Sequence, residues 1–167
     1  DYAFQNGYSI SEIDAITGPL IGRPKSATFR LMDLVGLDIM GHVNSNLYGA
    51  IPEDPYREIL RGEKTTAVMT AMIENGWLGN KSGQGFYKKT FVEGKREFWT
   101  INPDTLEYEA PDKVRFASVG EVRKIEELEQ RLPALLEQEP DRAVTYVRDT
   151  LLFMLAYAAH VAPEIAY

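Results

Sequence analysis

The sequence of 167 residues has no cysteine and only two histidines, His42 and His160. Without cysteine, disulfides, thiol catalysis and cysteine-bound metals are excluded. Two histidines are too few for a polyhistidine metal site, so we expect no metal. No apolar run reaches the roughly eighteen residues that a membrane span needs, and no signal peptide is visible. These features predict a cytoplasmic protein without a membrane span.

The two common phosphate-binding motifs are also missing. A Rossmann turn needs Gly-x-Gly-x-x-Gly, but after Gly83 and Gly85 the third position is Lys88. In a P-loop, glycine precedes Lys-Ser, whereas here Pro24 precedes Lys25 and offers no amide to a phosphate. Neither nucleotide motif is therefore present.

Positive charge is scarce relative to negative charge. Lys and Arg number 18 against 25 Asp and Glu, which gives a formal net charge of −7. This balance argues against broad binding to nucleic acid or to an anionic membrane, because both need a basic face. Hydrophobic residues make up 44% and charged residues 26%, as in ordinary globular proteins. The length allows one domain, or one domain with an appendage.

Residues 18–38 predict a tight corner followed by a helix. Glycines and prolines interrupt regular structure at Gly18, Pro19, Gly22 and Pro24. Apolar residues then recur at near-helical spacing over 28–36. We expect Gly36 to end this helix with a positive φ, and Asp38 to cap the next one.

The corner places the cationic side chain of Lys25 at the entrance of a helix. Free amides at a helix start favour an anion or a polar ligand. The alternative is a helix–helix turn without a ligand, and turns far outnumber sites.

Short helices are predicted on both sides of this corner. Ser9 and Glu12 have the spacing of a capping box, and the helix that they start extends to Gly18. Further helices are expected over 38–49, with Met40, Val43 and Leu47 on one face, and over 56–60 and 65–75.

The pattern changes to strands after Gly83. Aromatic and β-branched residues predict strands over 85–91 and 96–101, joined by a turn at Glu93-Gly94, and a third short strand over 106–109. A capping box from Ser118 to Glu121 predicts a helix that continues through Leu132. A long helix is expected over 141–161, with an apolar run over 151–159 that is suited to a core or an interface.

Both histidines favour structural roles. His42, near the Met40 and Val43 face of its helix, is expected to be a satisfied or partly buried structural residue and not a catalytic one. His160 ends the apolar helix, where the helix dipole favours it.

Two stretches resemble one known family. Residues 19–38, Pro-Leu-Ile-Gly-Arg-Pro-Lys-Ser-Ala-Thr-Phe-Arg-Leu-Met-Asp-Leu-Val-Gly-Leu-Asp, resemble the start of the helical C-terminal domain of bacterial 3-hydroxyacyl-CoA dehydrogenases, closest to the multifunctional fatty-acid oxidation type. Residues 79–88, Gly-Asn-Lys-Ser-Gly-Gln-Gly-Phe-Tyr-Lys, resemble the motif that closes the same domain. Their order and spacing make the pair more specific than either motif alone.

The resemblance implies a fold and a role in catalysis. The fold would be mainly α, like the C-terminal domain of 6-phosphogluconate dehydrogenase, with a small antiparallel sheet and C-terminal helices appended. In this family NAD and the catalytic His–Glu pair belong to a preceding Rossmann domain, and a catalytic Asn lies in the joining helix. We therefore expect a piece of a larger enzyme that carries no catalytic, cofactor-binding or metal-binding residue and is inactive alone.

What remains for this chain is a substrate-side and dimerisation role. The resemblance implies that the corner faces the cleft for the acyl-CoA substrate, with Lys25 and Ser26 as polar groups and Phe29 as an apolar wall. The corner is one residue longer than in the simpler stand-alone members of the family. The acidic net charge leaves room for a local basic patch that binds a CoA phosphate.

The expected division of the chain is a helical domain over 1–90, a β-hairpin and connecting helix over 91–139, and a long helix over 140–167. Tyr2, Ala3 and Ile10 recur as Tyr157, Ala158 and Ile165 at a constant offset. Because the multifunctional family carries two copies of the helical domain, the last helix is a candidate start of a second copy.

Two other interpretations stay open. One is a non-catalytic helical dimerisation or scaffold module, which the apolar run over 151–159 also supports. The other is a 6-phosphogluconate or 3-hydroxyisobutyrate dehydrogenase, which the Lys-Ser-Ala-Thr-Phe-Arg corner disfavours.

Overall fold

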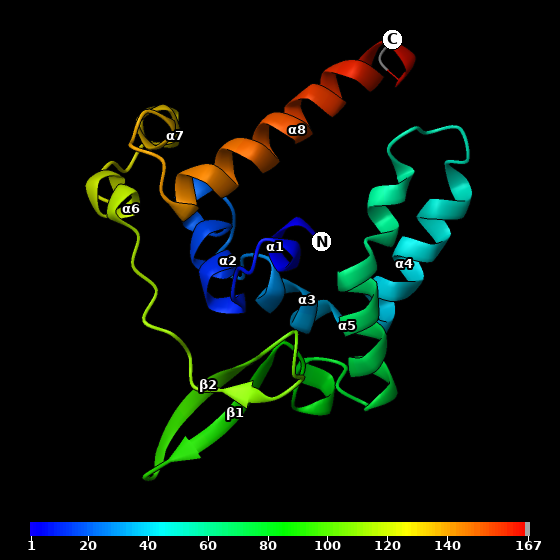
Figure 1. Cartoon of the computed structure of the whole chain (residues 1–167), viewed down its shortest axis with the longest axis vertical. Helices are drawn as coiled ribbons and strands as arrows, with labels where there is room; N and C mark the ends of the chain where they lie inside the picture. Colours follow the sequence, from blue (N-terminus) through cyan, green and yellow to red (C-terminus); the bar gives the residue numbers. More distant parts are fainter. Residues whose placement is uncertain (166–167) are drawn as a thin grey trace. The chain divides into compact units, whose positions relative to one another are not determined.

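The structure, a computed structural model, describes residues 1–165 (Figure 1). These residues form eight α-helices, three 3-10 helices and one three-stranded antiparallel sheet, which confirms the expected mainly α fold with a small appended sheet. By its internal contacts the chain divides into two compact units. Unit 1 comprises Asp1–Asp14 and Ser26–Lys113, and unit 2 comprises Ala15–Lys25 and Val114–Tyr167. The assignment of 140–167 to a second domain copy stays a prediction, and residues 166–167 lie outside the described part.

The first two helices are short, and a local cap starts the second. They are α1 (Tyr2–Gln5) and α2 (Ile10–Ile16), and α2 crosses from unit 1 into unit 2. The Glu12 amide donates to Ser9 Oγ at 3.1 Å, and the Ser9 amide donates to Glu12 Oε2 at 3.0 Å. The predicted capping box is confirmed.

The remaining helices of unit 1 follow the corner. They are α3 (Phe29–Val35), α4 (Leu37–Ala50), η2 (Arg57–Arg61), α5 (Glu63–Glu74) and η3 (Asn80–Ser82). Gly36 separates α3 from α4 at φ +105°, as predicted. Asp38 does not cap α4, because the helix begins at Leu37 and Asp38 lies in its first turn, where its carboxylate accepts from Lys81 Nζ.

An aromatic cluster forms the centre of unit 1. The Phe29 ring lies 5.4 Å from the Phe4 ring and 4.5 Å from the Phe86 ring, measured between centroids. All three side chains are buried. Burial of each ring contributes on the order of 2 kcal/mol, so this cluster holds α1, α3 and the segment before the sheet together.

The apolar stripe predicted for α4 lies mostly at the surface instead of in the core, and Met40 is half-buried. Val43 and Leu47 are 49% and 43% exposed, and Ile39 is 47% exposed. Helical periodicity predicts which residues share a face, and it does not specify what covers that face.

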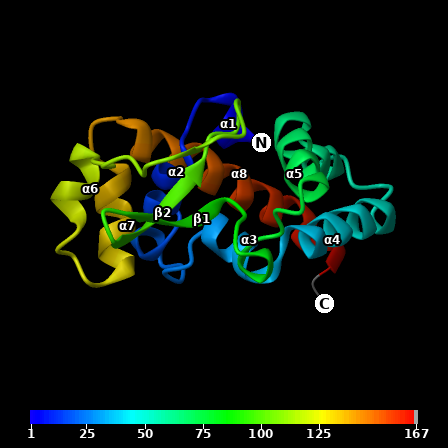
Figure 2. The ribbon, with the colours of Figure 1, turned by 90° about the horizontal axis from the view of Figure 1, so that it is seen from below.

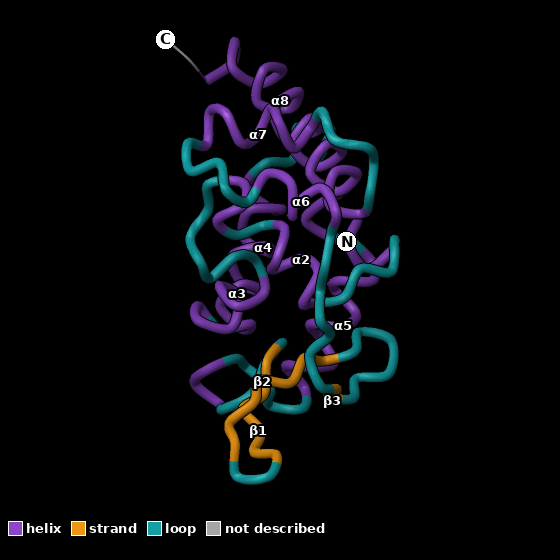
Figure 3. Tube along the Cα trace, turned by 90° about the vertical axis from the view of Figure 1, so that its left-hand side faces the viewer, coloured by secondary structure: helices purple, strands orange, loops and turns teal. Residues whose placement is uncertain are grey.

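The sheet follows α5 in the order β1 (Tyr87–Val92), β2 (Lys95–Ile101) and β3 (Tyr108–Glu109). Figure 3 shows β1 and β2 as a projecting hairpin. Its turn is Glu93-Gly94, with φ of +50° and +75°, the positive values that a tight hairpin turn needs. The predicted hairpin is confirmed, with β1 starting at Tyr87.

Unit 2 contains η1 (Pro19–Ile21), α6 (Ala117–Val122), α7 (Leu128–Leu136) and α8 (Arg142–Ile165). The predicted single helix over 118–132 is wrong, since α6 and α7 are separate helices (Figure 2). The break lets Leu128 pack against Gly22, and lets the Arg131 guanidinium donate to the carbonyls of Pro19 and Leu20. Pro133 lies inside α7 instead of ending it.

The predicted capping box at Ser118 is also wrong. Ser118 lies inside α6, and its hydroxyl donates to Asp141 at 2.9 Å. Asp141 instead caps α8, where its Oδ1 accepts the amides of Ala143 and Val144.

The long predicted helix is confirmed as α8, and its two halves differ in burial. Ala143, Val144 and Val147 are buried, whereas Leu152 and Leu155 are each 55% exposed. The apolar run over 151–159 is therefore largely a surface feature of unit 2. Among residues 1–165, no helix combines the length and apolar character that a membrane crossing requires.

Candidate functional site

The start of α3 is filled by a carboxylate from α2. Asp14 accepts the amides of Thr28 at 3.1 Å, Phe29 at 2.7 Å and Arg30 at 3.0 Å. A negative charge here satisfies orphan amides and complements the helix dipole. The helix entrance that the sequence offered as an anion site is therefore occupied by an internal anion, a contact between residues fourteen or more positions apart.

The predicted substrate residues occupy different environments. Lys25 is exposed, Ser26 is half-buried, and Phe29 is 5% exposed in the aromatic cluster. The division between the units falls between Lys25 and Ser26. Contact of these residues with a substrate stays a prediction.

A second carboxylate, that of Asp33 on α3, joins the two motifs that carry the family resemblance. Asp33 is 2% exposed, and its oxygens accept the amides of Phe86 and Tyr87, each at 2.8 Å. A Cβ added to Gly85 would lie 2.1 Å from Asp33 Oδ1, and one added to Gly79 would lie 2.4 Å from the Asp33 carbonyl oxygen. The glycines thus allow the 79–88 loop to close directly on Asp33.

Sequence reasoning did not identify Asp14 or Asp33. Asp33 carried a signal, because it is an acidic residue between Met32 and Leu34 in an apolar helical run. A buried carboxylate must be hydrogen-bonded, so its position predicted a partner without identifying it.

Burial perturbs the acidity of this region. Desolvation raises the pKa of Asp33 to about 6, although the amides of Tyr87 and Phe86 and the charge of Arg30 act in the opposite direction. Burial also raises the pKa of the Tyr87 phenol, whose hydroxyl donates to Asp14 at 2.8 Å. A phenol held in this way stays protonated near neutral pH and acts as a structural donor.

Arg30 lies beside these groups and stacks on two rings. Its guanidinium carbon is 4.1 Å from the centroid of Tyr87 and 4.9 Å from that of Phe98. Stacking on aromatic faces favours Arg in a half-buried position. The guanidinium is thereby fixed at the foot of the β1–β2 hairpin.

A separate cavity of about 620 Å³ lies among α4, η2 and α5 within unit 1. Its lining combines apolar Met69 and Ile73 with Ser45, Tyr48 and Arg61. The Arg61 guanidinium carbon lies 3.6 Å from the Tyr48 ring centroid. The lining has no histidine, and Glu63 contributes its one carboxylate.

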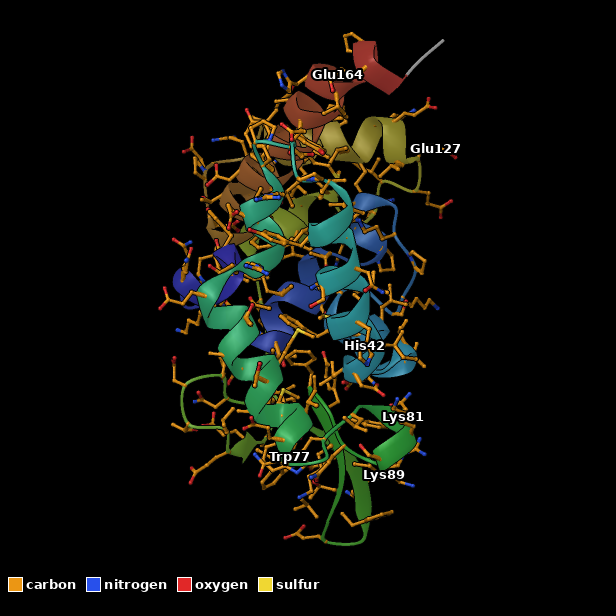
Figure 4. The ribbon with its side chains drawn as sticks, turned by 90° about the vertical axis from the view of Figure 1, so that its right-hand side faces the viewer. His42, Trp77, Lys81, Lys89, Glu127 and Glu164 are labelled. Carbon is orange, nitrogen blue, oxygen red and sulfur yellow. The ribbon has the colours of Figure 1, made fainter. Side chains whose placement is uncertain are left out.

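Within residues 1–165 no group of three or more His, Cys, Asp or Glu could hold a metal ion. His42 lies on the outer surface of α4 (Figure 4) and is exposed. The expectation that it is partly buried is therefore wrong, since the face of α4 near Val43 is itself uncovered.

Replacing Gly85 tests the closure on Asp33. We expect G85A to lower the free energy of unfolding by about 1–3 kcal/mol, the cost of overpacking, because its Cβ would meet Asp33 Oδ1. G49A is the control, since nothing lies within 4 Å of a Cβ at Gly49 in α4, and it should be neutral or slightly stabilising. Urea unfolding measures both; equal effects would refute the steric argument.

The raised pKa of Asp33 predicts a pH dependence of stability. The Asp33 carboxyl has a pKa of 3.8 in the unfolded chain and of about 6 in the folded chain, so the folded chain holds the proton more tightly. Proton binding therefore stabilises the fold fully below pH 3.8, and this stabilisation is lost as pH rises through about 6. D33N has no such proton. The difference in free energy of unfolding between wild type and D33N should fall by roughly 1–2 kcal/mol from pH 4.5 to pH 7. A constant or rising difference would contradict the assignment.

Comparisons with known proteins agree with the two motifs. The chain is 40% identical over 162 residues to a protein of Bacillus subtilis named probable 3-hydroxyacyl-CoA dehydrogenase. This match covers 97% of this chain and 19% of that protein. It is also 44% identical over 90 residues to a protein of the same name from Deinococcus radiodurans. This second match covers 54% of this chain and 24% of that protein.

A third relative, from Rickettsia prowazekii, is named as a trifunctional enzyme of a fatty acid oxidation complex. It is 35% identical over 113 residues, 66% of this chain and 15% of that protein. The chain thus spans less than a quarter of the length of these relatives. No solved structure gives a significant match. Residues 2–89, which include the Asp33 closure, match the family described as 3-hydroxyacyl-CoA dehydrogenase, C-terminal domain, and the chain belongs to this family.

Proposed function

We propose that the chain is the substrate-side and dimerisation domain of an NAD-dependent 3-hydroxyacyl-CoA dehydrogenase of fatty-acid β-oxidation, working in the cytoplasm. The family match over residues 2–89 carries this proposal. The names of the relatives support an oxidoreductase as the parent protein. The parent transfers hydride from C3 of an L-3-hydroxyacyl-CoA to the nicotinamide ring of NAD, and a base outside this chain accepts the hydroxyl proton.

The residues of this chain contribute binding and shape. Lys25 supplies an exposed cation and Ser26 a half-buried hydroxyl at the corner. Phe29, which packs against Phe4 and Phe86, supplies the apolar wall beside these polar groups. NAD and the catalytic groups belong to the Rossmann part of the parent, so the chain alone is inactive.

An assay of NAD reduction tests the proposal. A longer protein that includes this chain and the preceding Rossmann part should produce NADH from NAD and 3-hydroxybutyryl-CoA, and the 167-residue chain should produce none. NADH formation by the chain alone would overturn its non-catalytic role. A longer protein without activity toward 3-hydroxyacyl-CoA of any chain length would overturn the dehydrogenase assignment.

The exposed stripe of α4 supports the dimerisation role. Ile39, Val43 and Leu47 recur every four residues and therefore lie on one face of the helix. Each is more than two-fifths exposed. An exposed apolar stripe of this kind is typical of an interface.

Sedimentation of the chain tests this surface. The wild type should be a homodimer, and V43E should be a monomer because a charge at the centre of an apolar interface loses its water without a partner. N46E is the control, as Asn46 is an exposed polar residue on the same helix. A monomeric wild type, or a dimeric V43E, would exclude α4 as the dimer surface.

A scaffold module is the second candidate, and the exposed apolar run of α8 favours it. Leu152, Phe153, Met154 and Leu155 are all at least 45% exposed. Binding separates the two functions, because a scaffold does not bind acyl-CoA, whereas the substrate-side domain retains part of that affinity.

A further inference from the structure

One face of the β1–β2 hairpin carries both cations and aromatic rings. Lys89 Nζ lies 5.3 Å from the Phe91 ring centroid, and the Arg96 guanidinium carbon lies 5.5 Å from that of Phe98. Lys89 pairs with Phe98 and Phe91 pairs with Arg96 in the antiparallel register. Directly opposed residues share a face, so these four side chains form one surface, called here the hairpin face. All four are exposed, Phe91 by 64%. Figure 4 labels Lys89 on this hairpin.

Carboxylates are absent from the hairpin face among the paired residues of β1 and β2. Glu97 pairs with Thr90 on the opposite face, and its carboxylate accepts the indole N–H of Trp99 at 2.9 Å. In the part of the chain that the structure describes, neither Lys89 nor Arg96 forms an ion pair. Positive charge is therefore concentrated locally on a chain whose net charge is −7.

Arg30 adds a third cation at the foot of the hairpin face. Its guanidinium carbon is held over the rings of Tyr87 and Phe98. Within residues 1–165 this guanidinium donates no hydrogen bond, so its fork of N–H groups is free for an acceptor. Asp14 and Asp33 lie close enough to offset part of the charge, but their oxygens already accept backbone amides and the Tyr87 hydroxyl.

This combination specifies the chemistry of a ligand. Guanidinium forks bind phosphate bidentately, and exposed aromatic rings stack on planar bases with about 1–3 kcal/mol per base. Three cations around two exposed rings therefore fit a phosphorylated nucleotide. CoA carries a 3′-phosphate in addition to its diphosphate, whereas NAD carries only a diphosphate and a positive nicotinamide ring. The three cations favour CoA.

We propose that the hairpin face of unit 1 binds the 3′-phospho-ADP end of the CoA thioester. The adenine stacks on Phe91, and the phosphates contact Lys89, Arg96 and Arg30. The choice of CoA as the ligand rests on the proposed function, while the site itself rests on the charges and rings of the hairpin. The hairpin would thus hold the part of the substrate farthest from the reacting carbon.

Calorimetric titration of the 167-residue chain tests this site, with CoA and adenosine 3′,5′-bisphosphate as probes. The variant K89Q/R96Q removes two charges from the hairpin face, and K88Q/K95Q removes two from the opposite face of the same strands. K89Q/R96Q should weaken CoA binding about tenfold or more, and K88Q/K95Q less than about twofold. The reason is that a cation in direct contact with a phosphate contributes more to affinity than the long-range attraction of an exposed cation elsewhere on the strands. F91A should also weaken binding, and dephospho-CoA should bind more weakly than CoA.

Three results would overturn the inference: no binding of CoA or the bisphosphate by the wild type, equal loss in both double variants, or NAD binding as tight as CoA binding. Circular dichroism confirms that each variant is folded. Turnover of a 3-hydroxyacyl N-acetylcysteamine thioester, which lacks the nucleotide, by the longer protein is measured separately. Turnover without hairpin binding removes this inference alone. CoA binding at the hairpin without turnover of any 3-hydroxyacyl thioester removes the dehydrogenase assignment alone.

Discussion

The contact on which unit 1 depends is the closure of the 79–88 loop on the buried carboxylate of Asp33. The amides of Phe86, just before β1, and of Tyr87, its first residue, donate to this carboxylate, and glycine is needed where the loop backbone passes over it. A buried carboxylate without these donors would be costly. The interaction therefore fixes where the chain leaves the helical part and where the hairpin begins.

A second internal carboxylate, that of Asp14, acts in the same way as that of Asp33. Asp14 organises the start of α3, and Asp33 organises the start of β1, so both ends of the region that carries the family resemblance are set by internal carboxylates. Tyr87 connects them, because its amide donates to Asp33 and its hydroxyl to Asp14. With these amides satisfied, the start of α3 does not offer the amides of Thr28, Phe29 and Arg30 to an external anion.

Local features were predictable from the sequence and distant ones were not. The Ser9–Glu12 capping box, the end of α3 at Gly36 and the Glu93-Gly94 turn each depend on neighbouring residues. The break between α6 and α7 depends on Leu128 and Arg131 meeting the 19–22 segment, more than a hundred positions away. The exposure of the α4 stripe was also unpredictable, because periodicity does not identify a covering partner. For the candidate site, the two motifs predicted the family, whereas the hairpin face could be recognised only from the strand register.

The aromatic cluster at the centre of unit 1 has a consequence for how the chain folds during its synthesis. Phe4, Phe29 and Phe86 come from distant parts of the sequence, so their contacts require the closure of long loops and form more slowly than the local contacts within a helix. The earlier helices emerge from the ribosome with an unfinished core. Phe4 and Phe29 can meet early, but Phe86 can complete the cluster only after it has left the exit tunnel, and until then the nascent chain exposes apolar surface to which chaperones bind.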